Sequence, residues 1–306
     1  MIILGDKYTL TELEMKQLSD SFQNIKHISY SGKSAEEIIA LLKEEIQQRH
    51  VRLIVLNTSA VLPETVIQYM ANQEEKGIHY IAIETFLEQY LNKTLLPEDK
   101  PSDAYGVLPY TPVQYMIKRT IDYSVGLVIV VLASPVMVYT ALRIRRESPG
   151  PILFRQKRVG IRGEEFECIK FRSMHLDAEE DGAKFAEEDD PRAFEFGKKI
   201  RKYKVDELPQ LWNIFWGDMH LVGPRPERPI WVKEFEKSIP HYASRHVVAP
   251  GLTGWAQMEY HYGRGEVDAR QKLMYDLYYI RNWSLKFDLK IIWRTVRYLI
   301  RQNRDR

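Results

Sequence analysis

The first 94 residues alternate between short apolar runs and longer segments with an apolar position every three or four residues. Short apolar runs predict strands, and the three-to-four spacing predicts helices. This alternation predicts a small parallel α/β domain of Rossmann-like type over residues 1–94. Strands are expected at 1–4, 25–30, 51–56 and 78–83, and helices at 10–22, 34–50 and 63–76.

The first predicted strand is followed by Gly5-Asp6-Lys7-Tyr8, which lacks the glycine spacing of a dinucleotide site. We therefore expect an accessory domain with a regulatory, docking or stabilising role. Residues 95–112 are rich in proline, acidic and small side chains, and this composition predicts a linker.

A long uncharged apolar run at 123–142 has the length that a membrane helix needs, about 20 residues. Basic residues flank both ends, and such residues favour the cytoplasmic side of a membrane. Ser134 and Pro135 lie near the middle, where proline removes a backbone hydrogen bond. Two arrangements stay open: a re-entrant hairpin over about 119–145, broken at these two residues, and a kinked helix that crosses once.

Charged residues at the edge of this run lie at helical spacing. Asp122 follows Lys118 by four positions and Arg119 by three, so the three side chains would be neighbours on a helix. The pattern fits a local ion pair that anchors the helix at the membrane edge. It also fits a cation site for a lipid phosphate, and both interpretations remain open.

Residues 150–174 predict a β-hairpin with its turn at Gly160 and Gly163. Strand alternation places Lys170 and Arg172 on one face of the second strand. Two cations on one face could hold phosphates or balance carboxylates, although a solvated basic face has the same pattern.

Asp206 and Glu207 precede Pro209, and apolar positions at helical spacing follow, so this acidic pair is expected at a helix N-terminus. Simple capping by acids explains such a pair, and the helix end would help to keep Asp206 ionised. The rigid turn at 223–226 presents Arg225 shortly afterwards. Two carboxylates beside a fixed cation also suit chemistry on a diphosphate.

Two later segments complete the pattern. Residues 250–257, PGLTGWAQ, predict an ordered turn that ends in Gln257. Residues 285–302 predict a basic amphipathic helix, which would lie in a membrane interface or pack on a core with a solvated basic face.

Composition adds three limits. A chain of 306 residues has room for about two domains. The net charge of +2 gives no reason to expect a nucleic acid partner. The single cysteine, Cys168, excludes an internal disulfide and fits a reducing compartment.

Taken together, these motifs resemble the bacterial sugar transferases, which are monotopic polyprenyl-phosphate phosphoglycosyl transferases. The resemblance covers nearly two thirds of the chain. Its motifs are KRTIDY, the Ser134-Pro135 pair, GPILFRQKRVG, KFRSM, DELPQLWNIFWGDM, LVGPRPERP, PGLTGWAQ and YDLYYIRNWSLKFDLKIIW.

The resemblance implies a two-part α/β architecture: the Rossmann-like domain at 1–94, the linker at 95–112, and a monotopic α+β catalytic domain at 113–306. It also favours the re-entrant form of the 119–145 helix and an interfacial helix at about 285–302. The protein would then lie on the cytoplasmic face of the bacterial inner membrane, in contact with the inner leaflet.

The implied reaction moves a sugar-1-phosphate from a UDP-sugar to polyprenyl (undecaprenyl) phosphate and releases UMP. By resemblance Asp206 is the nucleophile that forms a phosphosugar-aspartyl intermediate, and Glu207 assists, with Mg²⁺ bound at this pair. The resemblance further assigns a set of substrate- and membrane-contacting residues. They are Lys170, Arg172, Arg225 and Gln257 for the UDP-sugar, and Lys118, Arg119, Asp122, Ser134 and Pro135 for the lipid phosphate and membrane.

Two other functions stay open on the sequence. One is a catalytically silent, membrane-anchored scaffold or regulator of glycan export. The other is a true glycosyltransferase, which would release UDP instead of UMP. The sugar, the glycan pathway and a homodimer are not decided by any motif.

Overall fold

The computed structural model describes residues 1–49, 51–96, 106–179, 182, 184, 190–260, 263 and 265–302. The chain divides into two compact units, Met1–Leu95 and Leu96–Arg306. Most of the expected linker, at 97–105, lies outside the described residues.

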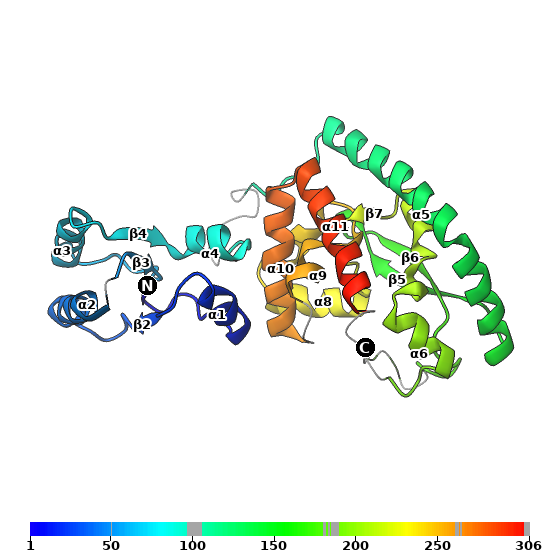
Figure 1. The fold of residues 1–306 in the computed structure, drawn as a ribbon, viewed down its shortest axis with the longest axis horizontal. Coiled ribbons are helices and arrows are strands. Elements are labelled where there is room, and N and C mark those ends of the chain that lie inside the picture. Colours follow the sequence, from blue (N-terminus) through cyan, green and yellow to red (C-terminus); the bar gives the residue numbers. More distant parts are fainter. Residues whose placement is uncertain are drawn as a thin grey trace. The chain divides into compact units, whose positions relative to one another are not determined.

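The first unit is a four-stranded parallel sheet with connecting helices (Figure 1). Its strand order is β2-β1-β3-β4, and the parallel α/β arrangement agrees with the sequence-based expectation. The narrower Rossmann-like assignment stays a prediction. In chain order the elements are β1 (Ile2–Leu4), α1 (Glu12–Ser19), β2 (Lys26–Ile28), α2 (Ala35–Arg49), β3 (Leu53–Leu56), α3 (Glu64–Glu74), β4 (His79–Ala82) and α4 (Ile83–Leu91).

Local sequence explains where these elements begin. The Ser34 hydroxyl accepts from Glu37 N and the Glu37 carboxylate accepts from Ser34 N, which is the reciprocal cap that starts α2. Gly5 follows β1 with φ +110°, and a Cβ there would lie 2.3 Å from Asn57 O. Only glycine therefore fits this turn. Helix α4 begins directly after β4 and was not predicted.

The second unit holds the long helix α5, a β-hairpin, a short parallel strand pair and several helices (Figure 1). The hairpin forms at the predicted place, with its strands antiparallel. The elements are α5 (Pro112–Glu147), β5 (Leu153–Val159), η2 (Ile161–Gly163), β6 (Glu165–Phe171), α6 (Glu195–Lys202), η3 (Val205–Glu207), α7 (Gln210–Trp216), β7 (His220–Val222), α8 (Pro229–Ser238), η4 (Tyr242–Val247), β8 (Gly251–Thr253), α9 (Trp255–Glu259), α10 (Glu266–Arg281) and α11 (Leu285–Gln302).

Helix α5 continues through Pro135, so the predicted break at Ser134-Pro135 is wrong. Proline has no N–H, which leaves the carbonyl of Val131, four residues earlier, without its helical donor. The Ser134 hydroxyl donates to this carbonyl at 2.9 Å. The serine thus replaces the missing hydrogen bond, and α5 is one curved helix instead of two arms of a hairpin (Figure 1).

Both ends of α5 are buried against other elements of the second unit, while the middle of the helix is exposed. Lys118, Arg119 and Asp122 are buried near the N-terminal end, and Thr140 and Ile144 near the C-terminal end. The helix is long and apolar enough to cross a membrane, yet only 11% of its most apolar window is buried. The exposed large side chains between the ends are Leu127, Val128, Val131, Leu132, Val136, Val138 and Tyr139.

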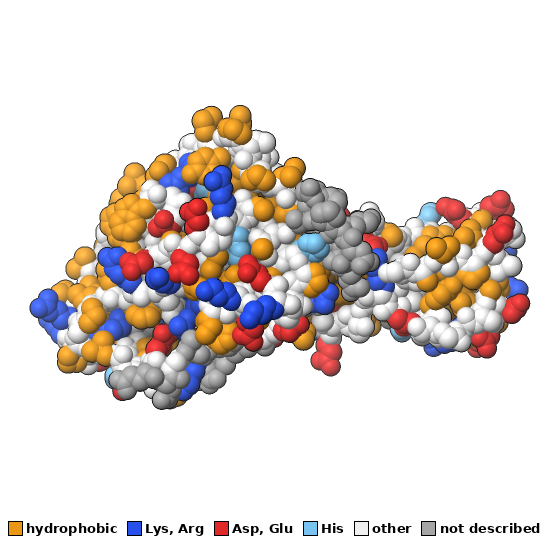
Figure 2. Space-filling view, turned by 180° about the vertical axis from the view of Figure 1, so that it is seen from behind, with side chains coloured by type: hydrophobic (Ala, Val, Ile, Leu, Met, Phe, Trp, Pro, Cys, Tyr) orange, Lys and Arg blue, Asp and Glu red, His pale blue; other side chains and the backbone are white. Residues whose placement is uncertain are grey.

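Further apolar side chains are exposed elsewhere in this unit. Helix α11 covers the predicted range and exposes Leu289, Trp293 and Val296, and α7 exposes Trp212 and Trp216. Figure 2 shows hydrophobic side chains, in orange, along the edge of the part that contains α5. The second unit therefore carries more exposed apolar surface than scattered single residues would give.

Glycines bring the chain segments 220–226 and 250–257 into close contact. Strands β7 and β8 pair in parallel, with His220 opposite Gly251. A Cβ on Gly251 would lie 2.0 Å from Gly223 N, and one on Gly254 would lie 2.2 Å from Gly223 O. These glycines are needed because any side chain would separate the turn that carries Arg225 from the start of α9, the short helix that carries Gln257 where the sequence predicted a turn.

Candidate active site

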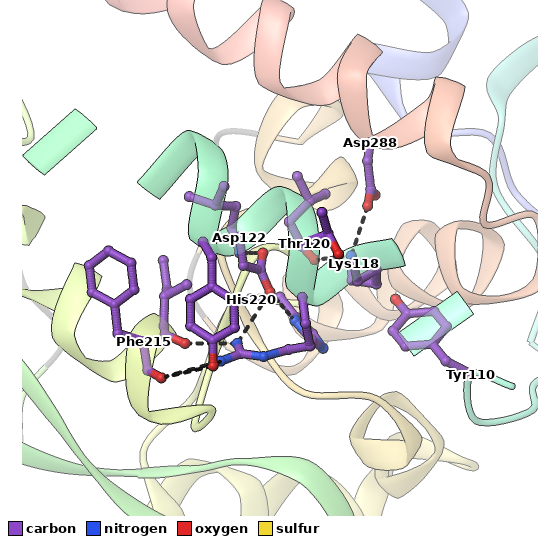
Figure 3. A network of polar contacts seen from close by, with 12 residues as sticks. Tyr110, Lys118, Thr120, Asp122, Phe215, His220 and Asp288 are labelled. Carbon is purple, nitrogen blue, oxygen red and sulfur yellow. Dashed lines mark hydrogen bonds and ion pairs between the residues drawn. The ribbon is translucent and has the colours of Figure 1, made fainter. Parts of the chain in front are cut away.

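A buried polar network fixes the start of α5 to the second unit (Figure 3). Lys118 Nζ donates to Val222 O, Tyr279 Oη and Asp288 Oδ2, each at 2.9 Å. Its side chain is about 1% exposed, and its three protein acceptors match its three N–H groups. The partner of Lys118 is Asp288 on α11, not Asp122 as the helical spacing suggested.

Arg119 and Asp122 join the same end of α5 to α7 and β7. Arg119 Nη1 donates to Ile214 O at 2.8 Å, and Asp122 lies 3.4 Å away. Asp122 accepts from Leu221 N at 2.8 Å and lies 2.6 Å from His220 Nδ1. Burial lowers the pKa of His220 despite the bond to Asp122, so a neutral imidazole donates through Nδ1.

These contacts agree with the anchoring interpretation of Lys118, Arg119 and Asp122. All three bind protein groups, and Lys118 has no N–H left for a phosphate. Their assignment to a lipid phosphate stays a prediction.

The acidic pair lies in the 3₁₀ turn η3, directly before the short helix α7. Lys204 begins this turn in the left-handed region, with φ 58°. Asn213 on α7 then bonds the edge of β6: its Oδ1 accepts from Ile169 N at 3.0 Å, and its Nδ2 donates to Glu167 O at 2.7 Å. Because Asn213 fixes α7 on the hairpin, Glu207 comes to lie beside Lys170.

Glu207 is held by two cations. Its Oε1 accepts from Arg225 Nη2 at 2.8 Å and from Lys170 Nζ at 3.2 Å. Burial by itself would raise the pKa of Glu207, but Arg225, Lys170 and Lys204 together bring it well below its usual value. The structure thus unites three predicted residues from three different elements, and Glu207 is ionised.

Asp206 is buried differently from its neighbour. It is 9% exposed, and no described residue donates a hydrogen bond to its Oδ1. Burial, followed by the charge of Glu207, raises the pKa of Asp206 to about 6. The expectation that a helix end favours its ionised form is therefore wrong, because η3 separates Asp206 from α7. The carboxylate is nevertheless ionised for the most part at pH 7.

Arg172 differs from its predicted position beside Lys170. Strand β6 ends at Phe171, and the buried guanidinium of Arg172 turns toward the end of α5. It donates to Ser148 Oγ at 2.7 Å, Ser148 O at 2.6 Å and Pro151 O at 2.6 Å. These bonds fix the link between α5 and β5, although Arg172 still lines the cavity described next.

A cavity of about 1330 Å³ is lined by the acidic pair and by all four predicted substrate-binding residues. Lys170, Arg225 and Gln257 line it together with Asp206 and Glu207. The lining holds 14 lysines and arginines but only five aspartates and glutamates, so it favours an anionic ligand. Gln257 Oε1 is buried and has no hydrogen-bond partner among the described residues.

Sequence reasoning missed the residues that hold Arg225 in place. Arg245 Nη2 donates to Arg225 O at 3.0 Å and lies 2.7 Å from Asp276 Oδ2. On the other side, Arg158 Nη1 donates to Pro226 O at 3.1 Å. Both arginines are far from the turn in sequence, and only the buried Asp276 on an apolar helix could have hinted at the first contact.

The comparison with protein families decides the class of this unit. The model of the bacterial sugar transferases matches residues 113–302, which include α5, the acidic pair and α11. The chain belongs to the bacterial sugar transferase family.

Curated relatives align with the same part of the chain. The UDP-N-acetylgalactosamine-undecaprenyl-phosphate N-acetylgalactosaminephosphotransferase of Aeromonas hydrophila is 44% identical over 195 residues, 64% of this chain and 46% of that protein. The UDP-glucose:undecaprenyl-phosphate glucose-1-phosphate transferases of Caulobacter vibrioides and Escherichia coli K12 are 41% and 40% identical. The alignment with the Caulobacter protein covers 62% of this chain and 72% of that protein. The alignment with the Escherichia protein covers 61% of this chain and 41% of that protein. The chain thus spans less than half of the Aeromonas and Escherichia proteins.

Proposed function

We propose that this chain transfers a sugar-1-phosphate from a UDP-sugar to polyprenyl (undecaprenyl) phosphate and releases UMP. The observation that carries the proposal is the pair Asp206 and Glu207 in a cationic cavity. Glu207 is engaged by Lys170 and Arg225, whereas Asp206 has a carboxylate oxygen without a donor. The names of the relatives support the substrate classes.

Asp206 is the nucleophile in this proposal. Its carboxylate oxygen attacks the β-phosphorus of the UDP-sugar, and the bond from that phosphorus to the oxygen shared with UMP breaks. UMP leaves with that oxygen and the electron pair, so the sugar-phosphate is held on Asp206 as an acyl phosphate. A phosphate oxygen of the polyprenyl phosphate then attacks the same phosphorus, and the Asp206 carboxylate is released. The two displacements predict ping-pong kinetics.

Glu207, Lys170 and Arg225 position charge around this step. Because Glu207 holds both cations, it fixes their direction before the substrate binds. Cations fixed in advance stabilise a transferring phosphoryl group without further reorganisation. Gln257 on α9 contributes an acceptor to the UDP-sugar.

The residues present fit a Mg²⁺ ion held mainly by its substrate. Mg²⁺ usually takes one or two protein carboxylates, with substrate phosphates and water as its other ligands. The described residues contain no group of three or more metal-ligating side chains, but Asp206 Oδ1 lacks a donor, as a ligand atom should, and Glu207 is adjacent. When bound there, Mg²⁺ would neutralise the diphosphate.

The way α5 is held supports monotopic attachment to the cytoplasmic face of the inner membrane. Its two ends contact the same unit, and its middle exposes apolar side chains. A helix that crossed the membrane would carry its two ends to opposite sides, and the contacts of Lys118 and Ile144 with one unit support the other arrangement, with both ends on one side. We propose that α5 enters the inner leaflet with both ends cytoplasmic, and that α11 lies in the interface. The N-terminal unit is then a Rossmann-like accessory domain.

Product analysis tests the proposal. Purified protein in detergent is incubated with a panel of UDP-sugars, polyprenyl phosphate and Mg²⁺, and the nucleotide products are separated. We expect UMP with at least one UDP-sugar and none from an Asp206→Asn variant. Release of UDP would indicate a glycosyltransferase, and no nucleotide release with any sugar would favour a silent scaffold.

A further inference from the structure

Helix α6 connects the apolar helix α5 to the catalytic cavity. Phe196 on α6 contacts two residues of α5. Its N donates to Glu147 Oε1 at 2.7 Å, and its ring lies 6.0 Å from the ring of Tyr139. On its other side α6 packs against the chain that follows β6. A Cβ on Gly197 would lie 2.0 Å from Ser173 O, so glycine permits this close approach. The position of α6 is therefore fixed from both sides.

The outer face of α6 presents two lysines to the cavity. Lys198 and Lys202 lie four residues apart, on one face of the helix, and both line the cavity that contains Asp206. Within the described ranges no carboxylate pairs with either of them, and Lys202 Nζ lies 5.5 Å from the Tyr203 ring centre. They differ in this from Lys170 and Arg225, which are engaged with Glu207.

We propose that Lys198 and Lys202 bind the phosphate of the membrane-borne acceptor. The inference rests on the proposed function and assigns a second phosphate site within the same cavity. A lipid phosphomonoester carries nearly two negative charges at pH 7, and two lysines complement it. Its apolar chain would extend along the exposed middle of α5, where Leu132 and Val136 are exposed.

The position of α6 favours the acceptor over the UDP-sugar. A UDP-sugar is soluble and needs no contact with an apolar helix, whereas the acceptor phosphate must reach Asp206 from the membrane. Among the described elements, α6 contacts α5 directly and also lines the cavity with unpaired lysines. Separate cations for donor and acceptor also suit a two-step reaction in which UMP leaves before the acceptor reacts.

The test compares two double variants. Lys198→Gln with Lys202→Gln removes two charges from α6. The control, Lys233→Gln with Lys237→Gln, removes two exposed charges at the same spacing from α8, and neither of these lysines lines the cavity. We expect the α6 variant to raise KM for polyprenyl phosphate about tenfold. KM for the UDP-sugar, and the burst of UMP formed without acceptor, should change less than about twofold.

A vesicle-binding assay distinguishes polyprenyl phosphate from an anionic phospholipid as the ligand of these lysines. Neutral phosphatidylcholine vesicles with polyprenyl phosphate are compared with vesicles of anionic phosphatidylglycerol without it, by co-sedimentation with wild type and both variants. The α6 variant should lose binding to the first vesicles only. Equal loss on the anionic phospholipid would overturn the inference, as would a raised KM for the UDP-sugar or an equal effect of the control. Absence of UMP from wild type would overturn the proposed function instead, and the binding comparison would still test the lysines.

Discussion

Arg225 Nη2 donates to Glu207 Oε1 at 2.8 Å, and this is the same oxygen that Lys170 Nζ reaches at 3.2 Å. One carboxylate of the acidic pair thus takes both cations, and the adjacent Asp206 keeps an oxygen without a donor. Two neighbouring residues of the same chemical type are given different tasks by their surroundings. Glu207 is ionised and orients charge, while the buried Asp206 Oδ1 is not engaged by any donor of the described residues.

Removal of Arg225 should therefore impair the reaction more than it impairs folding. Arg225→Ala leaves Glu207 with Lys170 as its remaining hydrogen-bonded cation and takes one fixed positive charge from the phosphate site. We expect kcat/KM for UMP release to fall by about 10²–10³. The matched control is Arg155→Ala, because Arg155 forms an exposed pair with Glu167 and does not line the cavity. Activity within threefold of wild type in Arg225→Ala would contradict the assigned role.

The pH dependence of the first displacement should report on Asp206. The attacking group is the ionised carboxylate, and burial together with Glu207 raises its pKa to about 6. The burst of UMP formed without acceptor should consequently accelerate as the pH rises through about 6 and become constant above it. Rapid-quench measurements across this range check the prediction. A burst rate that is constant from pH 5 to pH 8 would mean that the attacking group titrates elsewhere.

The same raised pKa predicts a cost in stability. A carboxyl group whose pKa is higher in the folded state contributes most to folding when it is protonated, below about pH 4, and that contribution is lost as the pH rises through about 6. Asp206→Asn should therefore raise the free energy of unfolding at pH 7.5 by about 1–3 kcal/mol and have little effect near pH 4. Thermal unfolding in detergent at the two pH values measures the difference. A variant that is destabilised at pH 7.5 would refute this interpretation.

The sequence predicted those features that depend on short-range patterns. The hairpin at 153–171, the helix at 285–302 and the acidic pair before a short helix follow from alternation, periodicity and turn residues. Contacts between distant segments could not be predicted in this way. Asp122 lies at helical spacing from Lys118, but Lys118 pairs with Asp288. Arg172 was expected on the same strand face as Lys170, but its guanidinium bonds Ser148. In both cases a buried charge took the acceptors that tertiary packing provided.

Proline in α5 shows a related limit. Proline breaks or kinks an isolated helix, and the sequence predicted a break at Ser134-Pro135 for this reason. The outcome depended on the adjacent serine, whose hydroxyl bonds the carbonyl that proline leaves without a donor. A reading of the Ser134-Pro135 pair as one unit would have predicted a continuous helix.

The attachment of both α5 ends to one unit predicts the membrane topology. Leu108 is exposed before α5, and Arg146 is exposed near its C-terminal end. Single cysteines at these positions, in a Cys168→Ala background, should both resist a membrane-impermeant maleimide added to intact cells. Both should react after permeabilisation. Labelling of the cysteine at position 146 alone in intact cells would show that α5 crosses the membrane.

The last prediction concerns the hydrogen bond inside α5. Ser134→Ala removes the donor to Val131 O. Val131 is on the exposed apolar part of α5 that we propose enters the leaflet, where no water would replace the lost donor. We expect a loss of about 1–3 kcal/mol of stability, seen as a lower unfolding temperature in nanodiscs. Pro135→Ala restores the backbone N–H that bonds the same carbonyl, so the double variant Ser134→Ala with Pro135→Ala should recover most of the loss. If the double variant is as unstable as Ser134→Ala alone, the serine acts through another contact. The matched control is Ser124→Ala: the Ser124 hydroxyl donates to Thr120 O at 2.7 Å, a carbonyl whose helical donor is still present, so its loss should be small.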